Sequence, residues 1–193
     1  YLGEFYDQYP KLKLELVMDD ALANIIAEGC DVGIRLGLSL AEHVVAVPIT
    51  PALEMIVVAS PSYLERHGTP ESPADLARFN CINYKFDGSG RLRSWAFNEP
   101  DADKRHLTQA VSGNLIINDN DSMIRAALNG LGIIQCMNIT VQKPLAEGRL
   151  TQVLTPWSHR HDGFYLYYPS RQHIPSKVRA LIDFFVARRE WTI

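Results

Sequence analysis

Two segments contain residue types that bind small molecules. The first consists of Arg35, Leu36 and Gly37, which end the predicted strand that begins at Asp31. An arginine can hold a carboxylate through two parallel hydrogen bonds, a geometry that lysine does not match. Arg35 could equally form an ion pair with Asp31 or Glu28, so a binding role and a structural role are both open.

The second segment is a polar run that precedes a helical pattern. Its residues are Asn118, Asp119, Asn120, Asp121 and Ser122. A helix N-terminus offers free N–H groups and a partial positive charge, which favour an anion. Simple capping of the helix explains the same pattern. Both interpretations can hold, because one side chain can cap while other amides face a ligand.

Two further residues are candidates because each lies where a predicted strand ends. Tyr84 ends one short strand, and Met137 follows another. Ligands of open α/β sheets bind beyond the carboxyl ends of the strands, so these side chains could line the same pocket. Trp95 also lies on a short strand, but for this residue a place in the core is favoured.

The cysteines and histidines indicate neither a metal site nor a catalytic site. Cys30, Cys81 and Cys136 are far apart and form no Cys-x-x-Cys spacing, which is typical of buried free thiols in a reducing compartment. His159 and His161 have no third ligand in view, so hydrogen bonding within a hinge loop is favoured. No Gly-x-Ser-x-Gly or His-Glu-x-x-His motif occurs. We therefore expect no enzyme activity, no cofactor and no metal.

The composition is typical of a soluble globular protein. Of the 193 residues, 47% are hydrophobic and 21% are charged, which excludes disordered, collagen-like and coiled-coil classes. A net charge of −3 gives no general attraction to nucleic acid. The sequence has no run of 18 apolar residues and no leader pattern, so we expect a cytoplasmic protein without membrane contacts. Because the chain starts at Tyr1 without a methionine, we expect a fragment of a longer protein.

The elements that would position these residues begin with a β-α-β unit. Residues 1–9 are typical of the end of an amphipathic helix. Lys11 to Met18 alternate polar and apolar residues, which predicts a strand. A helix then runs from Asp19 or Asp20 to Glu28, and Asp31 to Gly37 form the next strand. Such a unit belongs in a parallel sheet and should be right-handed.

The rest of the chain continues as short strands and helices. The further strands are predicted at His43–Pro48, Leu53–Ala59, Cys81–Tyr84, Arg93–Phe97, Leu107–Ile117, Ile133–Cys136, Leu150–Leu154 and Phe164–Tyr168. The further helices start at Ser60–Pro61, Ser72–Pro73 and Asn118–Ser122, or span Ile139–Ala146 and Ser176–Arg188. Asp87 to Arg91 favour a hairpin turn. The segment after Trp157 is interpreted as a loop.

Five segments in this order resemble a known family. They read DVGIRLG, VVASPSYLERHGTPESPADLARFNCINY, NDNDSMIRAALNGLGI, LAEGRL and LYYPSRQHIPSKVRALIDFF. In order and spacing they resemble the effector-binding domain of LysR-type transcriptional regulators. The resemblance extends from Tyr6 to Phe185.

The resemblance implies an α/β fold with two lobes, like the type II periplasmic binding proteins, in which two mixed sheets are flanked by helices. Lobe one would comprise residues 1–58 and 160–193, and lobe two residues 59–159. A small anionic metabolite would bind in the cleft between the lobes. Family members begin this domain with a strand and a loop that bears Ser or Thr, and we expect the fragment to lack both.

The resemblance also implies partners. The subunits would pair as a homodimer, with a tetramer in the full-length protein. The contact would involve the first helix, the strand Lys13–Val17 and the helix Ser122–Gly130. DNA would be bound only through an N-terminal domain that this chain does not include. A solute-binding protein or receptor module of the same fold is the alternative, and an enzyme on this scaffold is a third hypothesis.

Overall fold

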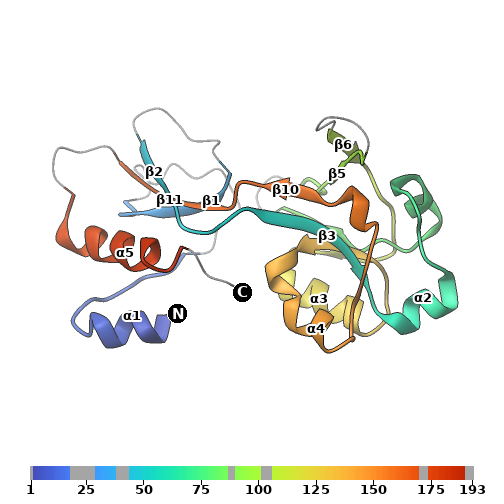
Figure 1. Ribbon diagram of the computed structural model, residues 1–193, viewed down its shortest axis with the longest axis horizontal. Coiled ribbons are helices and arrows are strands. Elements are labelled where there is room, and N and C mark those ends of the chain that lie inside the picture. The colour runs from blue at the N-terminus through green and yellow to red at the C-terminus, as the bar shows by residue number, and fades with distance from the viewer. Residues whose placement is uncertain are drawn as a thin grey trace. The chain divides into compact units, whose positions relative to one another are not determined.

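The computed structural model describes residues 2–17, 29–37, 44–86, 90–100, 106–169 and 174–189. The chain forms two compact units, whose helices and strands are labelled in Figure 1. Unit 1 combines Tyr1–Ala52 with Asp162–Ile193, and unit 2 is Leu53–His161. The boundaries that the resemblance implies lie elsewhere, after residues 58 and 159.

The strand β3 explains where the first boundary falls. β3 (Leu53–Ala59) pairs with β10 (His159–His161) at its start, with β8 (Ile134–Met137) along its middle and with β9 (Thr151–Val153) at its end. Every residue of β3 thus belongs to a ladder of unit 2. A boundary after residue 58 would divide β3, and one after residue 159 would divide β10. Unit 2 instead begins with the first residue of β3 and ends with the last residue of β10, so both paired strands stay whole.

Unit 1 is a small antiparallel sheet with helices. Its elements are α1 (Leu2–Gln8), β1 (Gly33–Leu36), β2 (Val44–Pro48), β11 (Phe164–Pro169) and α5 (Ser176–Val186). The strand order is β1-β11-β2, and both pairings are antiparallel. Leu166 of the central strand is fully buried. Phe5 of α1 is also buried, and its ring meets that of Phe184 edge-on at 5.1 Å between centroids.

Two predictions for the start of the chain differ from the structure. Residues 12–17 form no strand and no ladder with any strand that the structure describes, and Leu16 and Val17 are exposed. Alternation assigns side chains to two faces, but a strand also needs a partner that offers its backbone groups. The predicted parallel β-α-β unit is wrong as well, since β1 pairs antiparallel with β11. The predicted helix that ends at Glu28 lies outside the described residues.

Unit 2 contains most of the strands. Besides β3, β8, β9 and β10, its elements are α2 (Pro61–His67), η1 (Pro73–Arg78), β4 (Asn83–Tyr84), β5 (Trp95–Asn98), β6 (His106–Gln109), β7 (Ile116–Ile117), α3 (Asn120–Leu128), η2 (Asn138–Thr140), α4 (Gln142–Ala146) and η3 (Thr155–Trp157). The main sheet has the order β10-β3-β8, with β9 also on β3. β4 and β7 pair parallel, whereas β5 and β6 pair antiparallel.

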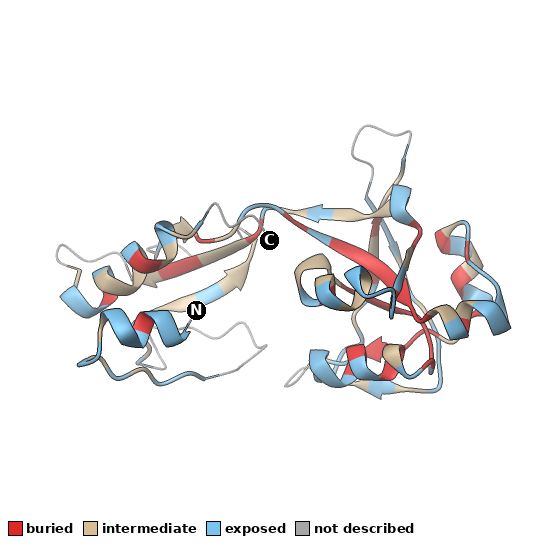
Figure 2. Ribbon diagram, turned by 60° about the horizontal axis from the view of Figure 1, so that its bottom comes forward, coloured by how far each residue is buried: buried red, intermediate tan, exposed pale blue. Residues whose placement is uncertain are grey.

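The core of unit 2 lies on both faces of β3, which is buried along nearly its whole length (Figure 2). Ile56 and Val58 belong to one hydrophobic cluster with the inner face of α3. Val57 and Ala59 belong to a second cluster, which includes the fully buried Trp95. Side chains alternate between the faces of a strand, so a continuous apolar run is what two covered faces require. The prediction of a core position for Trp95 is confirmed.

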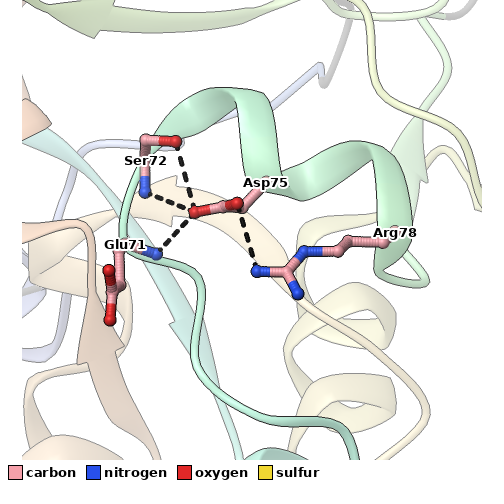
Figure 3. Close-up of polar contacts among 4 residues, drawn as sticks. All are labelled: Glu71, Ser72, Asp75 and Arg78. Carbon is pink, nitrogen blue, oxygen red and sulfur yellow. Dashed lines mark hydrogen bonds and ion pairs between the residues drawn. The ribbon is translucent and has the colours of Figure 1, made fainter.

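The two Ser-Pro signals open helices as predicted. Ser60 caps α2, because its Oγ accepts a hydrogen bond from the N–H of Tyr63 at 3.3 Å. The second cap is built around Asp75 of η1 (Figure 3). Its carboxylate accepts hydrogen bonds from the N–H groups of Glu71 at 3.0 Å and Ser72 at 2.9 Å. These bonds hold the pKa of Asp75 below its ordinary value.

Two predicted elements are each divided in the structure. The predicted strand Leu107–Ile117 becomes β6 and β7, which pair with different partners. Between them, a Cβ on Gly113 would lie 2.0 Å from the carbonyl oxygen of Cys81, so only glycine fits this close approach. The predicted helix Ile139–Ala146 becomes η2 and α4, with a break in backbone geometry at Val141.

Candidate functional site

The carboxyl ends of three strands of unit 2 lie beside one another. β4 and β7 run parallel, with Tyr84 opposite Ile117. A parallel bridge between Cys81 and Ile133 brings the start of β8 alongside the start of β4. The three chains therefore point the same way and end at one edge. This is the edge of an α/β sheet at which ligands bind.

Arg93, which was not among the predicted site residues, lies at this edge. Its guanidinium carbon lies 5.1 Å from the centroid of the Tyr84 ring. Its backbone N–H donates to the carbonyl oxygen of Tyr84 at 2.8 Å, and its Nη2 donates to the carbonyl oxygen of Gln135. The guanidinium is thus held in place from β4 and from β8.

The strand β5 explains why Arg93 is well positioned. The buried side chain of Gln135 donates to the carbonyl oxygen of Ala96 at 2.8 Å and accepts from its N–H at 3.2 Å. This amide acts as one more rung between β8 and β5. The sequence does contain a signal for Arg93: in the predicted strand Arg93–Phe97 it shares a face with Trp95, for which a place in the core was favoured. A charged residue on a buried face is unusual unless it has partners or a function.

The N-terminus of α3 lies at the same edge, directly after β7. Asp119 is the N-cap, and its carboxylate accepts from the N–H of Ser122 at 2.7 Å. Hydrogen bonds from the side chain and the N–H of Ser122 hold the pKa of Asp119 below its ordinary value. The capping interpretation therefore describes this segment, which is exposed throughout. A carboxylate of the chain already occupies the helix end, so Asn118, Asn120 and Asp121 offer mainly polar, partly acidic contacts.

Met137 and the residue after it close the end of β8. The carbonyl oxygen of Met137 accepts from Oγ1 of Thr140 at 2.7 Å. Asn138 Oδ1 accepts from the N–H of Glu54 at 3.2 Å, which fixes this turn to β3. The preceding Cys136 is buried, and burial raises its pKa to about 11. Its thiol therefore stays protonated at neutral pH, as a packed thiol does.

Arg35, Leu36 and Gly37 belong to unit 1, whereas the candidates above belong to unit 2. The guanidinium carbon of Arg35 lies 5.7 Å from the centroid of the Tyr167 ring. Gly37 has a φ of +75° and donates its N–H to the carbonyl oxygen of Gly163 at 2.9 Å. Asp31, one of the alternative partners of Arg35, pairs with Lys177 at 2.6 Å. The other alternative partner, Glu28, lies outside the described residues.

His159 and His161 differ from the prediction. They lie on β10, which pairs with β3, and not in a loop. His159 does make the hydrogen bond that was expected, from Nδ1 to Oδ1 of Asn98 at 2.9 Å. Within the described ranges, no group of three His, Cys, Asp or Glu side chains could hold a metal ion. None of the helices described is long and apolar enough to cross a membrane.

Solved structures with the same fold define the class of protein. Over 97% of this chain, the regulatory domain of AphB from Vibrio vulnificus matches with a TM-score of 0.80 and 25% identity, and 90% of that chain is covered. CrgA from Neisseria meningitidis, a LysR-type transcriptional regulator, matches with a TM-score of 0.81 and 27% identity over 97% of this chain and 62% of its own. The fold is thus the two-lobed α/β fold of LysR regulatory domains, which is like that of periplasmic binding proteins.

Sequence comparison identifies the family. The family model of the LysR substrate binding domain matches residues 1–190, so the chain belongs to this family. The HTH-type transcriptional regulator YcaN of Escherichia coli is 36% identical over 93% of this chain and 57% of its own length. PgrR of Escherichia coli, also an HTH-type transcriptional regulator, is 30% identical over 93% and 59%. The chain thus spans under two thirds of these relatives, which are transcriptional regulators and not enzymes.

Proposed function

We propose that this effector-binding domain recognises a small anionic metabolite at the edge where β4, β7 and β8 end. The observation that carries the proposal is the guanidinium of Arg93, which is held against Tyr84 and Gln135. Tyr84 is paired with Ile117, directly before the exposed segment Asn118–Ser122. A guanidinium fixed by other contacts loses little conformational entropy when it binds a carboxylate.

The charges at this edge favour one kind of effector. Arg93 would attract an anionic group, whereas the carboxylates of Asp119 and Asp121 would repel one. A carboxylate next to hydroxyl or amino groups fits this arrangement, because such groups donate hydrogen bonds to acidic and amide oxygens. The sequence alone suggested an anion at the α3 N-terminus. The cap by Asp119 argues for placing the anion at Arg93 instead.

Regulation would follow from differential binding. An effector changes the equilibrium between two arrangements of a protein only if it binds one of them more tightly. In the whole protein, the response would reach DNA through an N-terminal segment, in line with the names of the relatives as HTH-type regulators. The acidic balance of this chain is consistent with that division of roles.

A thermal-shift screen tests the proposal. Aliphatic hydroxy acids, dicarboxylates and aromatic acids are added to the chain. A ligand present at 100 times its Kd contributes about 2.7 kcal/mol, which corresponds to a rise in Tm of roughly 5–10 °C for a chain of this size. If Arg35 also contacts the effector, Arg35→Ala reduces this rise for the best carboxylate. If the rise in Tm is as large in Arg35→Ala as in the wild type, Arg35 does not contact the effector. A screen without any hit would contradict the proposal.

We also propose that the chain forms a homodimer through the surface that the resemblance implies. Apolar side chains are exposed there: Leu16 and Val17 are each 66% exposed, and Leu131 follows α3 with 52% exposed. Unit 1 of one subunit would contact α3 of its partner, and the reverse contact would complete the pair. In the full-length protein, two dimers would form a tetramer.

Sedimentation of the chain at micromolar concentration tests this pairing. We expect a dimer for the wild type and a monomer for Val17→Lys, because burying an unpaired ammonium in an apolar contact is unfavourable. Leu107→Lys is the matched control, since Leu107 is exposed on β6, away from the proposed contact. A wild type that sediments as a monomer, or a Val17→Lys variant that remains a dimer, would refute the proposal.

A further inference from the structure

Two histidines of unit 2 hydrogen-bond to one amide, a third packs against one of them, and the effector site uses none of the three. Nδ1 of His106 on β6 lies 3.0 Å from Oδ1 of Asn98, and Nδ1 of His159 on β10 lies 2.9 Å from the same atom. An amide oxygen can only accept hydrogen bonds, so both imidazoles donate through Nδ1. Asn98, at the end of β5, thus joins the β5–β6 hairpin to β10.

The third histidine completes a chain of rings. The ring of His159 meets that of His106 edge-on, with 4.8 Å between centroids, and meets that of His161 edge-on, with 4.6 Å. His159 lies between the other two and is partly buried, whereas His106 is exposed. Three neutral imidazoles pack well at these distances. Three imidazolium cations would repel one another, and the cation of the partly buried His159 would be poorly hydrated.

The cluster lies where the chain enters and leaves unit 2. Leu53 is the first residue of unit 2, and His161 is the last. These two residues are opposite each other in the antiparallel ladder of β3 and β10. β5 lies against β10, next to this ladder (Figure 1). A change in the contact between the hairpin and β10 would therefore act at both points where the chain passes from one unit to the other.

The elements around the cluster carry several other charged groups. Arg160 and Glu54 are opposite each other in the β10–β3 ladder, and their side chains lie on the face away from His159 and His161. Glu99 follows Asn98 in the chain, and Asp162 follows His161. η3, which contacts β5, consists of Thr, Pro and Trp and has no titratable side chain.

We propose that His106, His159 and His161 form a proton-sensitive latch, which holds the β5–β6 hairpin against β10 when neutral and releases it when protonated. The direction of the effect follows from the environment of His159. Burial, and then the neighbouring His161 and His106, lower its pKa below the ordinary 6.5. A lowered pKa means that the unlatched state binds protons more readily. The stability from the latch is thus complete above about pH 6.5 and is lost as the pH falls through the lowered pKa of His159.

The first test is an NMR titration of the imidazole ring protons of the chain from about pH 8 to about pH 4, across the range in which histidines ionise. The midpoint of His159 is expected below the ordinary value. His161→Gln should shift this midpoint upward, since it removes one cationic neighbour. Asn98→Asp should shift the midpoint of His159 upward, because a carboxylate favours the imidazolium. His67→Gln on α2 is the matched control and should leave all three midpoints unchanged.

The second test follows the latch itself by hydrogen exchange of the amides of β5, β6 and β10, corrected for intrinsic rates. Protection is expected to fall below the His159 midpoint in the wild type, and to fall less or not at all in Asn98→Asp, because the carboxylate stabilises the imidazolium of the latched state. Variants that retain the wild-type circular dichroism at pH 8 are compared, so general unfolding is excluded. An ordinary midpoint for His159 that His161→Gln does not move, or wild-type protection that does not depend on pH, would overturn the proposal.

Discussion

Trp95→Ala is expected to lower the free energy of unfolding of unit 2 by about 3–5 kcal/mol. Trp95 is fully buried in a cluster that includes side chains of β3, β5 and the residues around α2, together with Val153 and Leu154 from late in the unit's sequence. Removal of the indole leaves a cavity that the surrounding strands cannot fill without breaking their ladders. Because a domain is stable by only about 5–15 kcal/mol, this loss is large.

Urea denaturation followed by circular dichroism measures the loss. Trp157→Ala is the matched control: it makes the same substitution on η3, where the side chain is only partly buried against the same cluster. We expect a clearly smaller loss for the control. Equal losses for the two variants would mean that Trp95 is not at the centre of this core.

Arg93→Met is expected to reduce affinity for the best carboxylate of the screen by roughly 30-fold to 3,000-fold. This range corresponds to the cost of about 2–5 kcal/mol for truncating one member of a buried charge pair. Methionine retains much of the apolar stem over Tyr84 but cannot donate a hydrogen bond. The affinity of Arg93→Lys should lie between those of the wild type and Arg93→Met, since an ammonium keeps the charge and loses the planar fork.

Isothermal titration calorimetry measures these affinities, and the Tm of each unliganded variant shows whether it folds. Arg149→Met is the matched control, because Arg149 is exposed and its ion pair with Glu147 lies on the surface. We expect wild-type affinity for this control. If Arg93→Met folds and binds as tightly as the wild type, Arg93 does not hold the anion.

The sequence predicted those elements whose signals are local. β3 has the predicted bounds because six of its seven residues are apolar and suit a buried strand, and only Glu54 is exposed. α2 has its predicted start because Ser60 caps it, and it ends where Gly68 adopts a positive φ of 83°. In each case the signal lies within the segment, so no knowledge of distant residues is needed.

Elements that depend on distant partners were not predictable in this way. Residues 12–17 alternate as a strand does, yet none of the described strands pairs with them. The reverse holds for β10, whose sequence His-Arg-His has no apolar pattern and which forms because β3 offers an edge. A ladder is a property of two segments, and periodicity describes only one.

The candidate site was predicted in part for the same reason. Arg35 and Asn118–Ser122 were selected because each segment alone has a recognisable pattern. Arg93 was missed because its importance depends on Tyr84 and Gln135, which lie far from each other in the sequence. Only the fold brings these three residues together. Capping was one of the two interpretations of Asn118–Ser122, but the identity of the cap as Asp119, and its effect on where an anion can bind, required the geometry.

The most direct test of the proposed site is the set of backbone amide chemical shifts during titration with the best carboxylate of the screen. We predict that the largest changes occur at Arg93, Asn118–Ser122 and Met137, with smaller changes on the far side of unit 2, at α2 and η1. Large changes at α2 and η1, with the amides of Arg93, Asn118–Ser122 and Met137 unmoved, would contradict the proposal that the effector binds where β4, β7 and β8 end.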